Sequence, residues 1–388
     1  MTASYFAQPV DGAAATEIAE RFYHTGRLRN VLGLALKNAL ISILTLTLYR
    51  FWARTNMRRR IWSRVWVMGD NLEYTGTGWE LFRGFLISLP CFFLPAIFVF
   101  YVAPYAFDQT AAGLLILCFY ALSVPMIAAA RFWMRRYQLT RTRWRGIKLH
   151  LAGSGWSFAW ASTGWTLVQY LTAGWFTPVA RMNRAKLLWS QTRFGDQPFE
   201  FAEGESDLAK GLWGPFTLGW FAIPLSIFGG AIAASVVAAF IAGLFGAGAG
   251  ASGAQSVNEG AAMAAGIAIF ACTLLGALVL YLLLWAPYNA AAMNRIASLI
   301  SLDGARFRLR AKTWSLFGVT LAGWIIIIFS LGLLAPLAGL LKVRYVFNRL
   351  EIIGQPRFAE IGQNLTEGPR AGESMADAFD LDLGVGMI

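Results

Sequence analysis

Five basic side chains recur at one position of a repeated pattern and are the residues best suited to bind an anion. Each follows an apolar segment and precedes a glycine-containing turn: Arg59, Arg136, Lys186, Arg295 and Arg344. Guanidinium groups that converge on one point recognise phosphate through paired hydrogen bonds. Basic residues beside tryptophan and tyrosine also anchor helices in the headgroup region, without a specific ligand. The pattern therefore has two interpretations, which are contacts to an anionic lipid or small anion, and interfacial anchoring.

No other pattern predicts a catalytic, metal or cofactor site. The two histidines, His24 and His150, do not have the spacing of metal ligands. Glu73 and Glu80 lie in polar connector sequence, which favours solvated ion pairs over a carboxylate pair for acid–base chemistry. The glycines at 76–78 lack the Gly-Lys-Ser/Thr that completes a phosphate loop. We therefore expect no enzymatic activity, no metal and no cofactor.

The composition excludes an ordinary soluble protein. Of the 388 residues, 57% are hydrophobic and 14% are charged, whereas soluble domains have about 25% charged residues. The formal net charge of +12 would favour nucleic acid as the partner of a soluble protein. Most of these basic residues, however, lie just beyond apolar segments, where a membrane protein meets anionic headgroups. We expect a lipid bilayer with anionic lipids as the partner, and no nucleic acid.

The apolar segments predict an all-α polytopic membrane protein. Each of about seven stretches is long enough to be a spanning candidate: 31–52, 85–106, 110–132, 156–180, 214–246, 261–287 and 314–341. The predicted organisation is a polar N-terminal segment (1–29), a repeated membrane domain (30–362) and an acidic disordered tail (363–388).

An internal repeat is visible in the segments that contain the five basic residues. Ala53-Arg54, Asn56 and Trp62-Ser63 recur as Ala180-Arg181, Asn183 and Trp189-Ser190. We call the basic stretch that follows each apolar segment and contains one of the five residues a basic arm. The other three basic arms align less completely. After each arm, alternating apolar residues surround a glycine, as in the stretch around Gly69-Asp70. This pattern is typical of a short β-hairpin. Because a lone hairpin is marginal in water, we expect the five hairpins to form one small sheet on the cytoplasmic side.

The positions of the basic arms leave two topologies open. If all seven segments cross, the arms after the fourth and sixth segments lie opposite those after the first and third, against the usual bias. If instead 31–52, 156–180 and 314–341 re-enter and the other four segments cross, all arms are cytoplasmic. Candidate breaks in the three re-entrant segments are Thr45 and Thr47, Thr172 and Gly174, and Ser330 and Gly332.

The chain resembles the YjgN family of bacterial inner-membrane proteins over about residues 20 to 360. The residues that carry the resemblance are Phe22, Gly26, the stretch 44–53, Arg58-Arg59, Gly69-Asp70, the stretch 73–78, Glu80-Leu81-Phe82 and Gly84. Family members usually have glycine where this chain has Thr47. The resemblance implies a multi-pass protein of the bacterial cytoplasmic membrane. It supplies no reaction, substrate or site residue, because the family has no established function.

The leading functional interpretation is transport or permeation of a small or anionic solute or lipid, since many transporters combine repeats with broken helices. The alternative is a non-transporting membrane scaffold or anionic-lipid-binding protein. An intramembrane enzyme ranks third because no catalytic constellation is visible. A buried ionisable residue lining a polar cavity would favour transport. A solid apolar interior with basic residues on one face would favour the scaffold.

Overall fold

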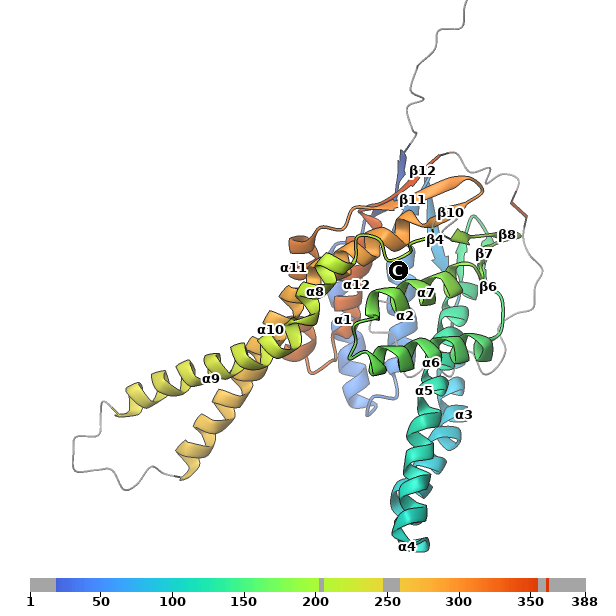
Figure 1. Cartoon of the computed structure of the whole chain (residues 1–388). Helices are drawn as coiled ribbons and strands as arrows, with labels where there is room; N and C mark the ends of the chain where they lie inside the picture. Colours follow the sequence, from blue (N-terminus) through green and yellow to red (C-terminus); the bar gives the residue numbers. More distant parts are fainter. Residues whose placement is uncertain (1–18, 202–205, 247–258, 355–360, 363–388) are drawn as a thin grey trace, which may run out of the picture.

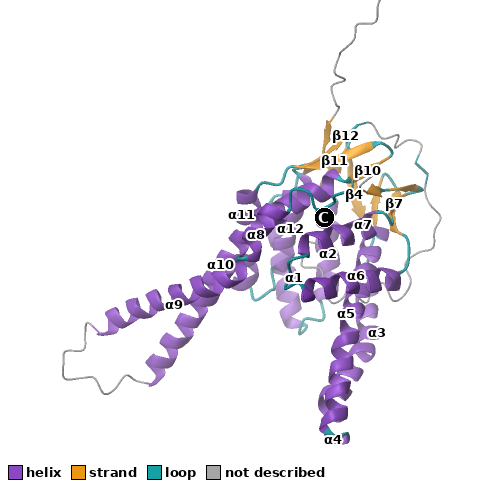
Figure 2. Ribbon diagram, viewed as in Figure 1, coloured by secondary structure: helices purple, strands orange, loops and turns teal. Residues whose placement is uncertain are grey.

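The computed structural model describes residues 19–201, 206–246, 259–354 and 361–362. The chain is mostly helical, with two antiparallel sheets gathered at one end (Figure 2). The acidic tail expected at 363–388 lies outside the described residues.

Three helical hairpins with the same dimensions form much of the body of the protein. In each, a helix of 17 residues is followed by a turn and a helix of 13 residues. The pairs are α1 (Leu28–Leu44) with α2 (Arg50–Trp62), α6 (Gly155–Leu171) with α7 (Thr177–Trp189), and α11 (Thr313–Phe329) with α12 (Ala335–Phe347).

The turns of the three hairpins share an unusual backbone conformation. Two successive residues have positive φ in each turn: Leu46 and Thr47, Ala173 and Gly174, and Leu331 and Gly332. Glycine adopts this conformation without steric cost, but the first hairpin makes the same turn with threonine. The turns expose apolar side chains, since Leu46 is 86% and Leu331 91% exposed.

Two longer helical pairs project away from the body (Figure 1). The first comprises α3 (Gly78–Ile97), a π-helical turn (η1, Phe98–Val102), α4 (Ala103–Ala106) and α5 (Gln109–Thr140). The second comprises α8 (Trp213–Trp220), α9 (Ala222–Gly246) and α10 (Glu259–Ser298).

Fewer helices than the seven predicted segments qualify as membrane crossings. Within the described residues, 3 helices are long and apolar enough by length and composition, namely Gly78–Ala106, Gln109–Thr140 and Gly266–Ser298. A fourth candidate is the pair Trp213–Trp220 and Pro224–Val237, which bends by 42°. The other three predicted segments are the ones broken by the hairpin turns.

The strands form a five-stranded and a seven-stranded sheet, both antiparallel. The first has the order β1 (Ala19–Arg21), β12 (Leu350–Ile353), β11 (Ala305–Leu309), β10 (Ile300–Leu302), β9 (Glu200–Phe201). The second has the order β2 (Tyr23–His24), β3 (Val65–Val67), β4 (Asp70–Tyr74), β5 (Thr142–Trp144), β6 (Ile147–Leu151), β7 (Thr192–Phe194), β8 (Gln197–Pro198). Three hairpins have two-residue turns with both φ values positive, at Met68-Gly69, Arg145-Gly146 and Asp303-Gly304, which suits the twist of paired strands.

Two extended segments link the sheets. Residues 19–24 pair with β12 through β1 and with β3 through β2. Residues 197–201 pair with β7 through β8 and with β10 through β9. The strand order therefore passes from one sheet to the other at both segments and returns to its start. In place of the single small sheet predicted, the strands make two sheets joined in a ring.

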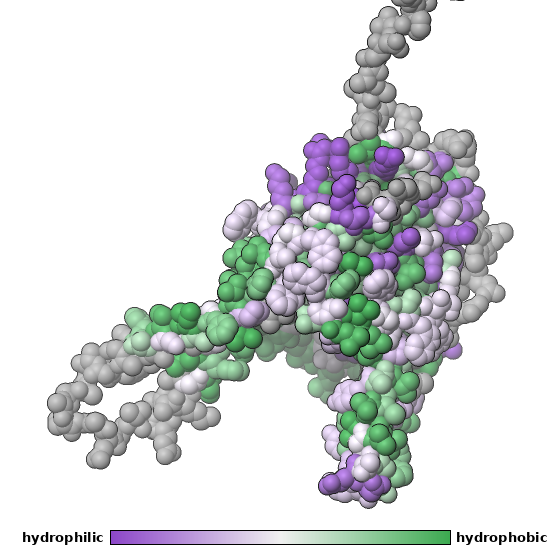
Figure 3. All heavy atoms as spheres, in the orientation of Figure 1, coloured by the Kyte–Doolittle hydropathy of each residue, from purple (hydrophilic) through white to green (hydrophobic). Residues whose placement is uncertain are grey.

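An apolar cluster fills the space between the strands and the adjoining helices. Its buried members include Trp144, Phe194 and Ile352 from strands, with Phe216 of α8 and Tyr288 of α10. On the outside, hydrophilic residues gather at the strand end, and hydrophobic residues cover the projecting helices (Figure 3). The molecule thus has a polar end built on strands and an apolar end built on helices.

Candidate functional site

Two of the five predicted basic residues bind backbone carbonyls in connectors between a strand and a helix. Arg59 on α2 donates to the carbonyl of Gly76, at 3.0 Å. Arg136 on α5 donates to the carbonyls of Leu151, at 2.9 Å, and of Gly153. Each arginine thereby holds its helix against the chain that leaves the neighbouring hairpin.

The other three predicted residues have different surroundings. Arg295 on α10 donates to the carbonyls of Asp207, at 2.9 Å, and Leu208, at 3.3 Å, which precede α8. The side chains of Lys186 and Arg344 have no hydrogen-bond or ion-pair partner among the described residues. These hydrogen bonds link the three arginines to separate connectors and do not join the five residues in one site.

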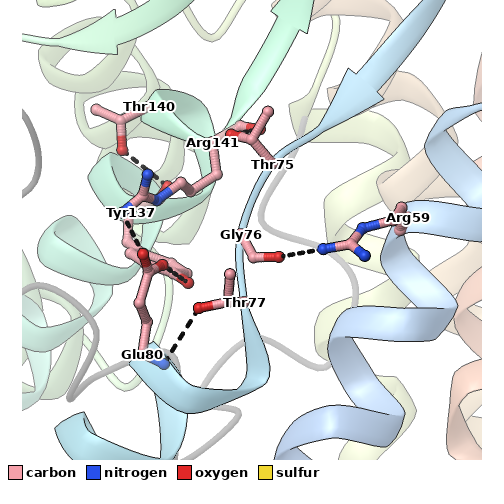
Figure 4. Close-up of polar contacts among 8 residues, drawn as sticks. All are labelled: Arg59, Thr75, Gly76, Thr77, Glu80, Tyr137, Thr140 and Arg141. Atoms are coloured by element: carbon pink, nitrogen blue, oxygen red, sulfur yellow. Dashed lines mark hydrogen bonds and ion pairs between the residues drawn. The ribbon is translucent and has the colours of Figure 1, made fainter.

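The connector from β4 to α3 is held from both sides, as Figure 4 shows. Thr75 N–H donates to the carbonyl of Arg141 at 2.8 Å, and the Thr77 hydroxyl accepts the N–H of Glu80 and caps α3. The Glu80 carboxylate accepts hydrogen bonds from Tyr137, at 2.9 Å, and from Arg141, at 2.6 Å. Glu80 is therefore a structural ion-pair partner that joins α3 to the end of α5.

The glycines of this connector are explained by packing. A Cβ atom on Gly76 would lie 2.7 Å from the Tyr74 ring, and one on Gly78 would lie 2.7 Å from the Trp52 side chain. Real side chains do not approach so closely, so both positions require glycine or a local shift. The two glycines of the Gly-Thr-Gly pattern thus allow the backbone to pack closely against Tyr74 and Trp52. This packing role agrees with a sequence that lacks the rest of a phosphate loop.

A second group of arginines, on α7, lies where α6, α7 and α10 meet. The Arg181 guanidinium donates to Asn289 Oδ1 at 2.8 Å and lies over the Tyr288 ring, 5.3 Å from its centroid. Arg184 donates to Gln169 Oε1 at 2.7 Å. Every one of these partners is uncharged.

Arg184 has further neutral contacts and a cationic neighbour. It donates to the hydroxyl of Thr166 on α6 at 2.9 Å. The positive charge of Arg131 on α5 lies near enough to act on it. Within the described part of the chain, Arg131, Arg181 and Arg184 form no ion pair with an acidic side chain. We call these three residues with Tyr288 the α7 arginine cluster.

Sequence reasoning missed this cluster, although the repeat contained a signal. Arg181 aligns with Arg54 and was one of many basic residues in the arms. Arg184 aligns with Met57 and Met134, both of which are buried apolar residues. In the repeat predicted from the sequence, a cation therefore stands where two other copies have a buried methionine, and this departure is the signal that could have marked the position.

The two histidines lie on strands, apart from the α7 arginine cluster. Burial lowers the pKa of His24, aided by the charges of Arg344 and Arg64 and opposed by a backbone hydrogen bond to Ile61. Burial also lowers the pKa of His150, together with the charges of Arg136 and Arg193. The described residues contain no group of three or more His, Cys, Asp or Glu side chains placed to hold a metal ion.

The apolar helices and the polar strand end are those of an α-helical membrane protein. Residues 19–378 match the model of DUF898, a bacterial protein family of unknown function, and the chain belongs to this family. DUF898 is the YjgN family that the sequence resembles. No curated protein and no solved structure matches the chain.

Proposed function

We propose that the strands and basic arms lie on the cytoplasmic side of the bacterial inner membrane and that the three short hairpins re-enter the bilayer from that side. Each hairpin begins and ends beside strands; α1–α2, for example, lies between β2 and β3. A 17-residue helix is about 25 Å long, less than the hydrocarbon core of about 30 Å. The exposed leucines at the tips support insertion into lipid.

The common dimensions of the hairpins support an internal repeat. In this proposal, one unit comprises a pair of helices that leaves the strand layer and returns to it, a basic arm and the β-hairpin that follows. Three of these helical pairs are the short hairpins, and two are the longer pairs. Since each helical pair returns to the strand layer, all basic arms lie on one face.

The function that the geometry supports best is the binding and movement of a small anionic solute or lipid through the membrane. The observation that carries this proposal is Arg184, a half-buried cation with neutral partners between α6 and α7. Ionisable residues among membrane helices are costly and usually serve a substrate pathway. Broken helices beside them are a common way to build a transport site.

Flux through reconstituted liposomes tests transport. The full chain should accelerate release of an anionic solute such as phosphate, or transbilayer movement of a fluorescent anionic lipid, above protein-free liposomes. The Arg184→Gln variant should reduce this rate, whereas Arg60→Gln, which changes an exposed residue of α2, should not. Rates equal to those of protein-free liposomes for both probes would reject transport.

The second candidate is a non-transporting scaffold that binds anionic lipid, and the apolar cluster beneath the strands favours it. Described side chains such as Phe216 and Trp144 form an apolar interior beneath the strands, as is suitable for a scaffold that needs no polar route. The two candidates differ in one measurement, because a scaffold retains anionic lipid on purification and gives no flux in the liposome assay.

A further inference from the structure

The three arginines of the α7 arginine cluster have no acidic partner among the residues that the structure describes. Arg181 and Arg184 lie one turn apart on α7, and the positive charge of Arg131 on α5 acts on Arg184. Their described partners are neutral: Asn289, Gln169, Thr166 and the carbonyl of Ser162. Like charges that lie near one another repel. A bound anion would remove this cost.

The donors of the cluster exceed its acceptors. Tyr288 is 1% exposed, and its hydroxyl, which interacts with the Arg181 guanidinium, has no acceptor for its own proton among the described residues. The buried Nε atom of Arg184 is also without a hydrogen-bond partner among the described residues. Buried polar groups normally have a hydrogen-bond partner, and a site for an ion or water is one reason for an exception. Two groups able to donate, without an acceptor among the described residues, point to an anion.

An aromatic wall continues from the cationic end of the cluster. The Tyr288 ring lies 5.4 Å from the Phe216 ring, which lies 5.9 Å from that of Trp175 at the α6–α7 turn. Trp220 donates to the carbonyl of Ala173 in the same turn, at 2.9 Å. Tyr288 therefore stands between guanidinium groups on one side and an apolar aromatic surface on the other.

We propose that the α7 arginine cluster binds the phosphate group of an anionic ligand, held by Arg181 and Arg184 with Tyr288 as a third donor. Planar guanidinium groups match phosphate oxygens in pairs. Arg131 is exposed and Arg181 half-buried, so the phosphate enters from their side. The aromatic wall suits the apolar part of a phospholipid, while the charged end also accepts free phosphate. This inference deepens the proposed function and rests on it only for the fate of the ligand.

Equilibrium binding to the purified full chain tests the site. The probes are phosphatidylglycerol, phosphatidylcholine and inorganic phosphate, measured by lipid titration in native mass spectrometry and by calorimetry. The test variant is Arg181→Gln/Arg184→Gln. The matched control is Arg193→Gln/Arg306→Gln, which removes two positive charges from exposed strand positions.

The expected result is at least tenfold weaker binding of phosphatidylglycerol by the test variant and unchanged binding by the control. Arginine-dependent binding of inorganic phosphate with equal strength would assign free phosphate as the ligand source and still support the site. Equal affinities of the test and control variants for both anionic probes would overturn the proposal.

Two further measurements keep the outcome interpretable. If Arg181→Gln/Arg184→Gln loses its thermal transition in detergent, Tyr288→Phe replaces it, with an expected loss of about threefold in affinity for the anionic probe. Binding is measured without flux, so a chain that binds through these arginines but moves nothing retains the site and rejects only transport.

Discussion

At the scale of single residues, three of the five recurring basic residues, Arg59, Arg136 and Arg295, donate hydrogen bonds to backbone carbonyls. Replacing Arg59 with Gln removes its hydrogen bond to the carbonyl of Gly76. We expect the free energy of unfolding to fall by about 1 kcal/mol, the usual net contribution of one hydrogen bond, because Arg59 is exposed and water weakens the bond. Equilibrium unfolding in mixed micelles measures this change.

The neighbouring Arg60 provides the control for that experiment. Its side chain is exposed and has no hydrogen-bond partner among the described residues. Arg60→Gln should leave the unfolding free energy within about 0.5 kcal/mol of the parent. A loss of stability as large as that of Arg59→Gln would show that charge, not the bond to Gly76, is responsible.

The two histidines predict how stability depends on pH. Their pKa values are lowered in the folded chain, so the unfolded chain binds more protons between the folded pKa and about 6.5. Stability should therefore fall as the pH drops below about 6.5. Melting temperatures at pH 7.5 and 5.5 measure the effect, and His24→Gln should make the difference smaller. If the difference between the two melting temperatures is the same in His24→Gln as in the parent, other titratable groups cause the pH dependence.

The sequence predicted the recurring basic position but not what most of its members bind. Arg59, Arg136 and Arg295 donate to backbone carbonyls. Because every residue has a backbone carbonyl, the acceptor of such a hydrogen bond cannot be recognised from the sequence. The Arg184 signal was present in the sequence as a departure from methionine, but its neutral partners come from another helix and required the fold.

At the scale of elements, the hairpin turns carry a conformational cost that differs between copies. Thr47 and Gly332 occupy equivalent turn positions, with φ of 68° and 83°. A left-handed conformation costs a non-glycine residue about 1–2 kcal/mol. Thr47→Gly should therefore stabilise the chain, and Gly332→Thr should destabilise it by about 1 kcal/mol or more.

These two substitutions together measure the free-energy cost of the left-handed backbone conformation in the turn. A Cβ atom at Gly332 would meet no atom within 4 Å, so steric crowding does not add to the cost. Unfolding of both variants in the same micelles gives the comparison. If Thr47→Gly and Gly332→Thr both stabilise the chain, or both destabilise it, the turn conformation does not set the cost.

The breaks in the hairpins were predictable because glycine, proline and threonine interrupt apolar runs at these sites. Thr47 shows that the surrounding helices can impose the turn without glycine. The arrangement of the strands was less accessible. Local alternation indicated hairpins, but pairing such as Ala19 with Ile353 joins distant parts of the chain and has no local signal.

At the scale of the whole molecule, the central claim is that every basic arm lies on the cytoplasmic face. The ring of strands provides the physical reason, since all helical pairs start and finish at that layer. Seven ordinary spans would instead place the arms of α7 and α10 on the opposite face from those of α2 and α5.

Cysteine accessibility in intact cells tests this claim most directly. Single cysteines replace Arg193, Arg306 or Gln109 in a chain whose native Cys91, Cys118 and Cys272 are changed to Ala; Gln109, at the tip between α4 and α5, is the external control. A membrane-impermeant maleimide should label Gln109→Cys in intact cells. It should label Arg193→Cys and Arg306→Cys only after permeabilisation. Labelling of either arginine position in intact cells would contradict the account.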